Sequence, residues 1–118
     1  MPYHPDPDQQ PALLSLAPIV HVDDDAQASI AERFARFHAA NPHIADALLS
    51  LARPLMHPGR RKFGVKMLYE KLRYEYAFHT AGDEEYRLNN DFTSRYSRLL
   101  VDIEPRLRDF IEMRELRS

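Results

Sequence analysis

Apolar side chains recur every three or four positions over much of the chain, and this is the spacing of one face of an α-helix. Between about residues 25 and 56 the pattern predicts two helices with almost no loop between them. Asp25 or Ser29 begins the first helix. Asn41-Pro42 ends it and begins the second, because proline at a first helical position lacks only an N–H that would be unbonded there anyway. The two apolar stripes are Ile30, Phe34 and Phe37, then Ile44, Leu48, Leu51 and Leu55.

The second half of the chain carries two longer helical patterns and one short one. The first covers residues 65–78, after His57-Pro58-Gly59 has ended the preceding helix. Another begins at Asn90 or Asp91, and Glu104-Pro105 ends it and starts a final short helix. We therefore expect an all-α fold, a compact single domain of four to five helices. Its predicted core is Phe34, Phe37, Ile44, Leu48, Leu51, Leu68, Leu72, Phe92, Tyr96, Leu99 and Ile103.

The connection between the last two long helices contains Gly82 and an acidic cluster, Asp83 to Glu85. Residues 80–89 form either a loop or a short two-stranded hairpin, and a hairpin there would make the domain winged-helix-like. This connection is longer than the about 3–4 residues that join the two helices of a helix-turn-helix. The pattern therefore favours a helical domain without deciding whether it has a wing.

Residues 1–24 differ from the rest of the chain because they hold five of its nine prolines and part of an acidic run. Proline at this density prevents helix formation, so residues 1–11 are expected to be disordered. Residues 13–22 are too apolar for a free tail. They form a strap across the domain, an edge strand, or a segment that docks into a partner, and the strap is the commoner arrangement. We accordingly divide the chain into a Pro-rich acidic tail or strap, 1–24, and a helical domain, 25–118.

Composition narrows the class of protein. A chain of 118 residues has room for one core, and with no cysteine it cannot form a disulfide framework or a thiolate zinc site. No apolar run approaches the about 20 residues that span a bilayer, and the N-terminus lacks the pattern of a secretion signal. We expect a cytoplasmic protein that does not bind a membrane.

The net charge of −2 hides an uneven distribution along the chain. Residues 1–58 carry three Arg against seven acidic residues, whereas residues 59–118 carry thirteen Lys or Arg against eleven acidic residues. Within residues 59–76 there are six basic and two acidic residues. A local basic patch of this kind is common in nucleic-acid-binding proteins, although it is equally typical of a solvated helix face.

Basic and aromatic residues alternate in this region, and they are the candidate binding residues. Guanidinium groups bind phosphate bidentately and can read guanine edges. Thr93 and Ser94, early in a helix, could donate hydrogen bonds to phosphate. The alternative is that the cations pair with nearby acidic side chains. The candidates for nucleic-acid or partner binding are Arg60, Arg61, Lys62, Lys66, Arg73, Tyr74, Arg87, Thr93, Ser94, Arg95 and Arg98.

Tyrosine is also concentrated here. Aromatic rings stack on bases in single-strand binders and anchor protein interfaces. At helical spacing, however, Tyr69, Tyr76 and Tyr96 are expected to lie in the core with their hydroxyl groups reaching its edge. Only Tyr74 and Tyr86 are expected to be free for binding.

The residue patterns that catalysis or metal binding requires are missing. The six histidines include no HExxH motif, and His38 and His43 are separated by the Asn41-Pro42 break. The chain has neither a G-x-S-x-G elbow nor a Gly-rich phosphate loop, and it has only three glycines. We expect no enzyme activity, no cofactor and no metal site.

Four segments resemble a family of small, functionally unassigned helical proteins of bacteria and their phages or prophages. They are FHAANPHIADAL (37–48), GVKMLYEKLRYEYA (64–77), LNNDFTSRYSRLLVDIEPRL (88–107) and FIEMRELRS (110–118). The resemblance covers about residues 34–118, and the LNNxFTSRYxRL string is its most specific part. It implies neither catalytic residues nor ligands. It does imply a mobile-element setting.

The function expected from these observations is a non-enzymatic DNA-binding module, a small regulator of a phage or mobile element that uses its basic helix face. The alternative is a protein-interaction module that uses the same Arg/Tyr surface against an acidic partner, as a phage-encoded modulator or inhibitor of a host protein. A homodimer fits either function. A structural or assembly subunit is a third, weaker alternative.

Overall fold

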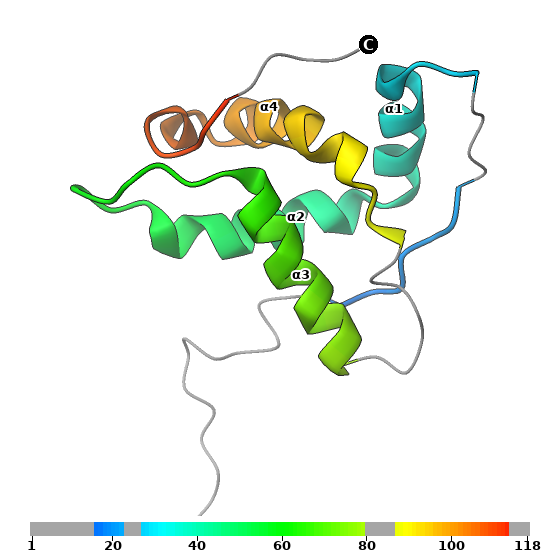
Figure 1. The fold of residues 1–118 in the computed structure, drawn as a ribbon, viewed down its shortest axis with the longest axis horizontal. Helices are drawn as coiled ribbons and strands as arrows, with labels where there is room; N and C mark the ends of the chain where they lie inside the picture. Colours follow the sequence, from blue (N-terminus) through cyan, green and yellow to red (C-terminus); the bar gives the residue numbers. More distant parts are fainter. Residues whose placement is uncertain (1–15, 23–26, 80–86, 114–118) are drawn as a thin grey trace, which may run out of the picture.

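The fold was analysed in a computed structural model that describes residues 16–22, 27–79 and 87–113 (Figure 1). In these ranges the chain forms α-helices joined by short turns, with no strand beyond a single parallel bridge between Phe63 and Ile111. The predicted all-α single domain is therefore confirmed. The helices are α1 (Ile30–Ala40), α2 (Pro42–Ala52), α3 (Val65–His79) and α4 (Thr93–Ile103), with 3₁₀ turns η3 (Arg53–Leu55), η5 (Asn90–Phe92) and η6 (Pro105–Asp109).

The corner between α1 and α2 forms where the sequence predicts it. Ser29 caps α1, and its hydroxyl oxygen accepts a hydrogen bond from the Glu32 N–H at 3.1 Å. At the other end, the Asn41 N–H donates to the carbonyl oxygen of Phe37 at 2.8 Å, and Pro42 starts α2. Proline at this position permits a sharp turn with no intervening loop because no helical N–H is lost.

The end of α2 corrects a sequence prediction. The second helix was expected to reach His57, but α2 stops at Ala52 and continues as the 3₁₀ turn η3. Pro54 is the reason, because it has no N–H to donate to a carbonyl one turn back and its ring clashes there. The chain tightens instead, and the Met56 N–H donates to the Arg53 carbonyl oxygen at 3.1 Å.

The core lies where α2, α3 and α4 pack on one another, and α1 covers α2. The apolar positions at helical spacing in α3, Val65, Leu68, Tyr69, Leu72 and Tyr76, are all buried. Tyr69, Tyr76 and Tyr96 are each 0 % exposed. The expectation that these three tyrosines are core residues is therefore confirmed, but the expectation that their hydroxyl groups reach the edge of the core is wrong for Tyr69 and Tyr96, whose hydroxyl oxygens are buried. The largest fully buried side chains besides them are Ile19, Ile44, Leu48, Leu68, Leu72, Leu100, Leu107, Ile111 and the polar Asn41.

Ile103 was predicted to be a core residue, but its side chain is 48 % exposed. The prediction counted helical turns from Phe92, which lies in the tighter turn η5 and not in α4. The buried residues of α4 are Tyr96, Ser97, Leu100 and Val101. At 100° per residue, Ile103 lies about 90° from the centre of that face, so it points away from the core.

Residues 16–22, which we call the strap, lie across the helices, with Ile19 fully buried and Leu16 packed against the core. Figure 1 shows the strap running from the C-terminal half of α3 past the segment that leads into α4. The predicted disorder of residues 1–11 and the predicted boundary near residue 24 lie outside the described residues.

The region of the predicted wing is described only from Arg87 onward, so the hairpin at 80–89 stays a prediction. The described end of this connection is well anchored. Leu88 is buried, and the Asn89 side-chain oxygen accepts a hydrogen bond from the Asp91 N–H at 2.9 Å, which caps η5. Among the described helices, none combines the length and apolar character that crossing a bilayer requires.

Candidate interaction surface

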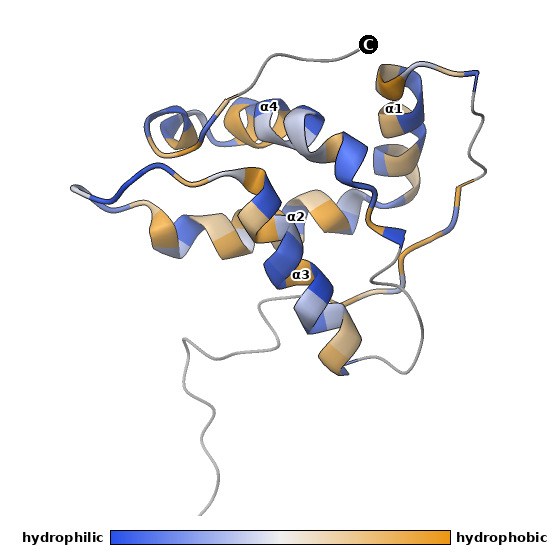
Figure 2. Cartoon of the chain, viewed as in Figure 1, coloured by the Kyte–Doolittle hydropathy of each residue, from blue (hydrophilic) through white to orange (hydrophobic). Residues whose placement is uncertain are grey.

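The basic loop, Arg60, Arg61 and Lys62, is exposed between η3 and α3 (Figure 2). A turn that the Arg60 N–H closes on the His57 carbonyl oxygen at 3.2 Å precedes the loop, and Gly59 lies in this turn with φ of 83°, a left-handed conformation that favours glycine. At the other end the loop is held to the C-terminal segment, because the Phe63 N–H donates to the Phe110 carbonyl oxygen at 2.9 Å. The three cations are therefore presented by a loop whose ends are both fixed.

Two neighbouring hollows meet at Gly64, at the start of α3. One is lined by the basic loop, Phe63 and Met67, and the other by Lys66, Thr93, Ser94 and Ser97. Glu112 lines both hollows. Six of the predicted binding residues therefore lie around one end of the domain: Arg60, Arg61, Lys62, Lys66, Thr93 and Ser94.

Three features of these hollows weaken them as phosphate sites. The Glu112 carboxylate lies beside Gly64, so a negative charge stands among the cations. The Thr93 hydroxyl donates to the Asn90 carbonyl oxygen at 3.1 Å, which uses its proton within the chain. Ser94, early in α4, is half-buried.

Arg73 performs a structural role, away from the hollows. Its Nη2 donates to the Leu88 carbonyl oxygen and to Asn90 Oδ1, both at 2.6 Å, and its Nη1 contacts Glu70 Oε1 at 2.8 Å. The guanidinium carbon also lies 5.5 Å from the centre of the Tyr69 ring. Arg73 thus ties α3 to the segment that leads into α4.

We expect Arg73→Ala to lower the free energy of unfolding by about 1.5–3 kcal/mol, because hydrogen bonds to a charged donor are lost and a carbonyl loses its partner. Lys66→Ala, an exposed position on the same helix, should change it by less than about 0.5 kcal/mol. Urea denaturation followed by circular dichroism measures both. Equal effects of the two substitutions would contradict the structural role of Arg73.

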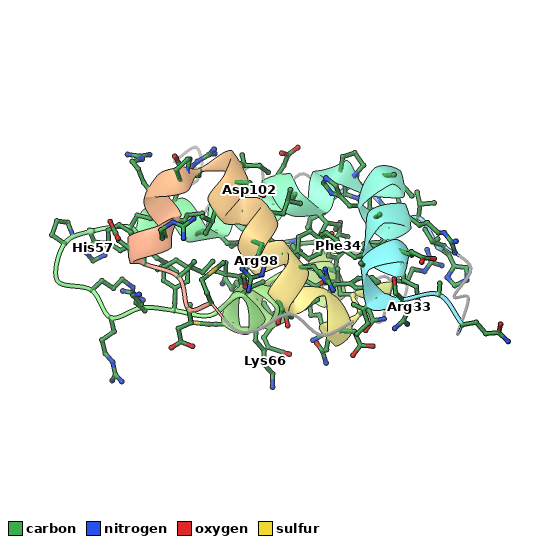
Figure 3. The ribbon with its side chains drawn as sticks, turned by 90° about the horizontal axis from the view of Figure 1, so that it is seen from above. Arg33, Phe34, His57, Lys66, Arg98 and Asp102 are labelled. Carbon is green, nitrogen blue, oxygen red and sulfur yellow. The ribbon has the colours of Figure 1, made fainter. Side chains whose placement is uncertain are left out.

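Three more of the predicted arginines are also engaged with the domain. Arg87 Nη1 donates to the Ile19 carbonyl oxygen at 2.6 Å, so it holds the strap. Arg95 and Arg98 are half-buried on α4, and both make interactions within the chain. Figure 3 shows Lys66 pointing away from the domain while Arg98 lies against it.

A second row of side chains on α3 faces outward, and we call it the α3 stripe: Met67, Lys71, Tyr74 and Phe78. The exposed fractions of Met67, Tyr74 and Phe78 are 46 %, 59 % and 69 %. The rings of Tyr74 and Phe78 stack with centroids 5.9 Å apart, and Lys71 Nζ lies 5.8 Å from the Tyr74 ring centre. Tyr74 was predicted from the sequence as a binding residue, whereas Met67 and Phe78 were not, although the stripe's spacing of four, three and four residues is a helical signal.

Glu75 holds the polar edge of the α3 stripe in place. One carboxylate oxygen lies 3.5 Å from Lys71 Nζ, and the other lies 3.1 Å from His79 Nε2. The Phe78 and His79 rings meet edge to face, with centroids 4.9 Å apart. Lys71, Tyr74 and Phe78 are therefore packed on one another. The C-terminal half of α3, which bears Tyr74 and Phe78, extends beyond α2 (Figure 1).

Among the described residues, no three His, Asp or Glu side chains gather as they would around a metal ion. Comparison of the chain with protein-family models, with characterised proteins and with solved structures finds no match. The resemblance to small phage and prophage proteins therefore stays an expectation based on its motif.

Proposed function

We propose that this protein is a non-enzymatic protein-interaction module whose α3 stripe binds a helical segment of an acidic partner protein. The observation that carries the proposal is the exposure of three large apolar side chains in one row on one helix. Exposed apolar residues that form a contiguous patch commonly mark an interaction site, whereas single ones are ordinary.

The spacing of the stripe favours a helix as the binding element. Positions 67, 71, 74 and 78 alternate steps of four and three residues, which is the spacing of a seam between two packed helices. Tyr74 and Phe78 offer large rings that are already packed on each other, so little side-chain freedom is lost on binding.

The charge around the stripe favours an acidic partner. Met67 belongs both to the stripe and to the hollow that the basic loop lines, so the apolar row runs directly into three exposed cations. Lys71 adds a fourth cation within the row. A partner helix with an apolar seam and acidic residues toward one end would satisfy both features.

DNA binding by the same end of the domain is a second candidate that the basic loop favours. Its three cations and Lys66 are exposed and lie near Ser94 at the start of α4. Arg73 and Arg87, which the DNA-binding hypothesis also used, donate to backbone carbonyl groups of the chain itself. The cationic surface is therefore smaller than the sequence suggests.

Peptides selected from a displayed library of amphipathic 20-residue helices provide the test. For the peptides that bind, Tyr74→Ser and Phe78→Ser should each weaken affinity about 30-fold, the effect of losing an interface residue worth about 2 kcal/mol. Charge reversal of Arg60 and Arg61 should weaken it less, and this effect should shrink as salt rises. Fluorescence anisotropy measures each affinity.

Ile103→Ser is the matched control, because Ile103 is a similarly exposed apolar residue on α4 (48 %). It should leave peptide affinity unchanged. If the selected peptides bind the Tyr74→Ser and Phe78→Ser variants as tightly as the unmodified chain, the α3 stripe is not the binding site. A labelled DNA duplex that binds with a steep salt dependence, unaffected by the two stripe variants, would favour the second candidate instead.

A further inference from the structure

The strap is held in its groove mainly through its backbone. Three side chains from separate parts of the domain form hydrogen bonds with backbone groups of three of its residues. The Tyr76 hydroxyl donates to the Ala17 carbonyl oxygen at 2.7 Å, and Arg87 Nη1 donates to the Ile19 carbonyl oxygen at 2.6 Å. The third side chain is that of Asn41, which binds the backbone of Val20.

Asn41 binds Val20 as a neighbouring β-strand would. Its Oδ1 accepts from the Val20 N–H at 2.6 Å, and its Nδ2 donates to the Val20 carbonyl oxygen at 3.0 Å. The same Nδ2 donates to the Phe37 carbonyl oxygen at 3.2 Å, and the residue is 0 % exposed. The helical domain therefore orients this amide by itself, and the amide offers one donor and one acceptor to an extended peptide.

One side chain of the strap enters the core fully. Ile19 is 0 % exposed, whereas its neighbours Pro18 and Val20 are exposed, and Val20 is 51 % exposed. The groove thus binds an extended backbone and one aliphatic side chain. This combination of main-chain hydrogen bonds with an alternating side-chain pocket is how proteins bind extended peptides.

We infer that this groove is a peptide-binding site, and that the strap of a second copy of the chain occupies it in a strap-exchanged dimer. The contacts in the groove would be the same for the strap of its own chain and for the identical strap of a second copy. Only four residues, 23–26, join the strap to the part of the chain that leads into α1, and three of them are aspartates. A short connection favours exchange of the segment between copies, and each copy then supplies one strap and one groove, which closes a twofold dimer.

This inference is independent of the proposed function, because the groove uses Asn41, Tyr76 and Arg87 and none of the α3 stripe. Two complementary variants test it. Ile19→Asp disables the strap and keeps the groove, while Asn41→Ala disables the groove and keeps the strap. Each should be monomeric alone, and a 1:1 mixture should form a two-chain complex in native mass spectrometry and light scattering.

A labelled peptide of residues 12–24 tests the groove directly. It should bind the Ile19→Asp chain at least tenfold more tightly than the unmodified chain, whose own strap competes, and should not bind an Ile19→Asp/Asn41→Ala chain. Val20→Asp is the matched control, because this exposed side chain can change while its backbone bonds remain. The Val20→Asp chain should exchange straps like the unmodified one.

Circular dichroism must first show that each variant keeps its helices. Where Asn41→Ala does not fold, Arg87→Ala serves as the groove variant, because it removes the bond to the Ile19 carbonyl oxygen from an exposed residue. Absence of peptide binding to the folded Ile19→Asp chain would overturn the site. Peptide binding without a complex in the 1:1 mixture would overturn the second copy as its occupant.

Discussion

Tyr96→Ala is expected to lower the free energy of unfolding by about 3–5 kcal/mol, the range for removing a large aromatic side chain from a core. Tyr96 is 0 % exposed, and its ring packs against other aromatic rings of the core. Its ring centroid is 4.8 Å from that of Phe34, edge to face, and 5.8 Å from that of Tyr69. Alanine would remove both contacts and leave a cavity where α1, α3 and α4 meet. Urea denaturation measures the change.

Tyr96→Phe separates the ring from its hydroxyl. Within the described part of the chain, the buried Tyr96 hydroxyl has no hydrogen-bond partner. Removing a buried polar group that has no partner is neutral or stabilising, by up to about 1–3 kcal/mol. Loss of stability in Tyr96→Phe comparable to that in Tyr96→Ala would show that the hydroxyl, and not the packed ring, stabilises the core.

The second large effect is a loss of stability at alkaline pH. Burial raises the pKa of Tyr96 above its ordinary value of 10.0. Burial also raises the pKa of Tyr69 well above that value, the nearby Tyr96 adds to the rise, and Arg73 opposes it. Above about pH 10 the unfolded chain therefore loses protons that the folded chain keeps. Stability should fall by about 1.4 kcal/mol per pH unit for each tyrosine.

The direction follows from which state binds more protons. Below pH 10 both states keep the phenol protons, so the two tyrosines make stability independent of pH there. Between pH 10 and the folded-state pKa values, the folded state binds more protons, and unfolding becomes easier as pH rises. Thermal melts at pH 9 to 12 should show a shallower decline in Tyr69→Phe/Tyr96→Phe, and identical declines would exclude these groups as the cause.

Local patterns predicted most of the helical framework, and particular residues show why. Asn41-Pro42 marks the α1–α2 corner because proline has a strong positional preference, and the apolar residues from Val65 to Tyr76 define the buried face of α3 because their spacing matches the helical period. Both predictions are confirmed. The predicted end of α2 was wrong because the influence of Pro54 was overlooked. The sequence contained the signal for the correct end, since a proline inside a helical pattern ends the helix.

The candidate binding surface was harder to predict because its members are distinguished by partners far away in sequence. Arg73 and Arg60 are equally basic, yet Arg73 donates to the carbonyl of Leu88, 15 positions away, while Arg60 is exposed in a loop. Arg87 donates to a carbonyl 68 positions away. A local sequence pattern carries no information about contacts between residues that lie so far apart in the chain. Whether the remaining surface binds a protein or DNA stays a prediction.

The sequence by itself determined the helices, the corner at Asn41-Pro42 and the tyrosine-rich core, because helix propensity and periodicity act between residues a few positions apart. Only the tertiary structure decided which cations hold the chain together, that Asn41 binds the strap, and that the outward row of α3 meets the basic loop. These features depend on contacts between distant segments, and such contacts exist only after the helices have packed.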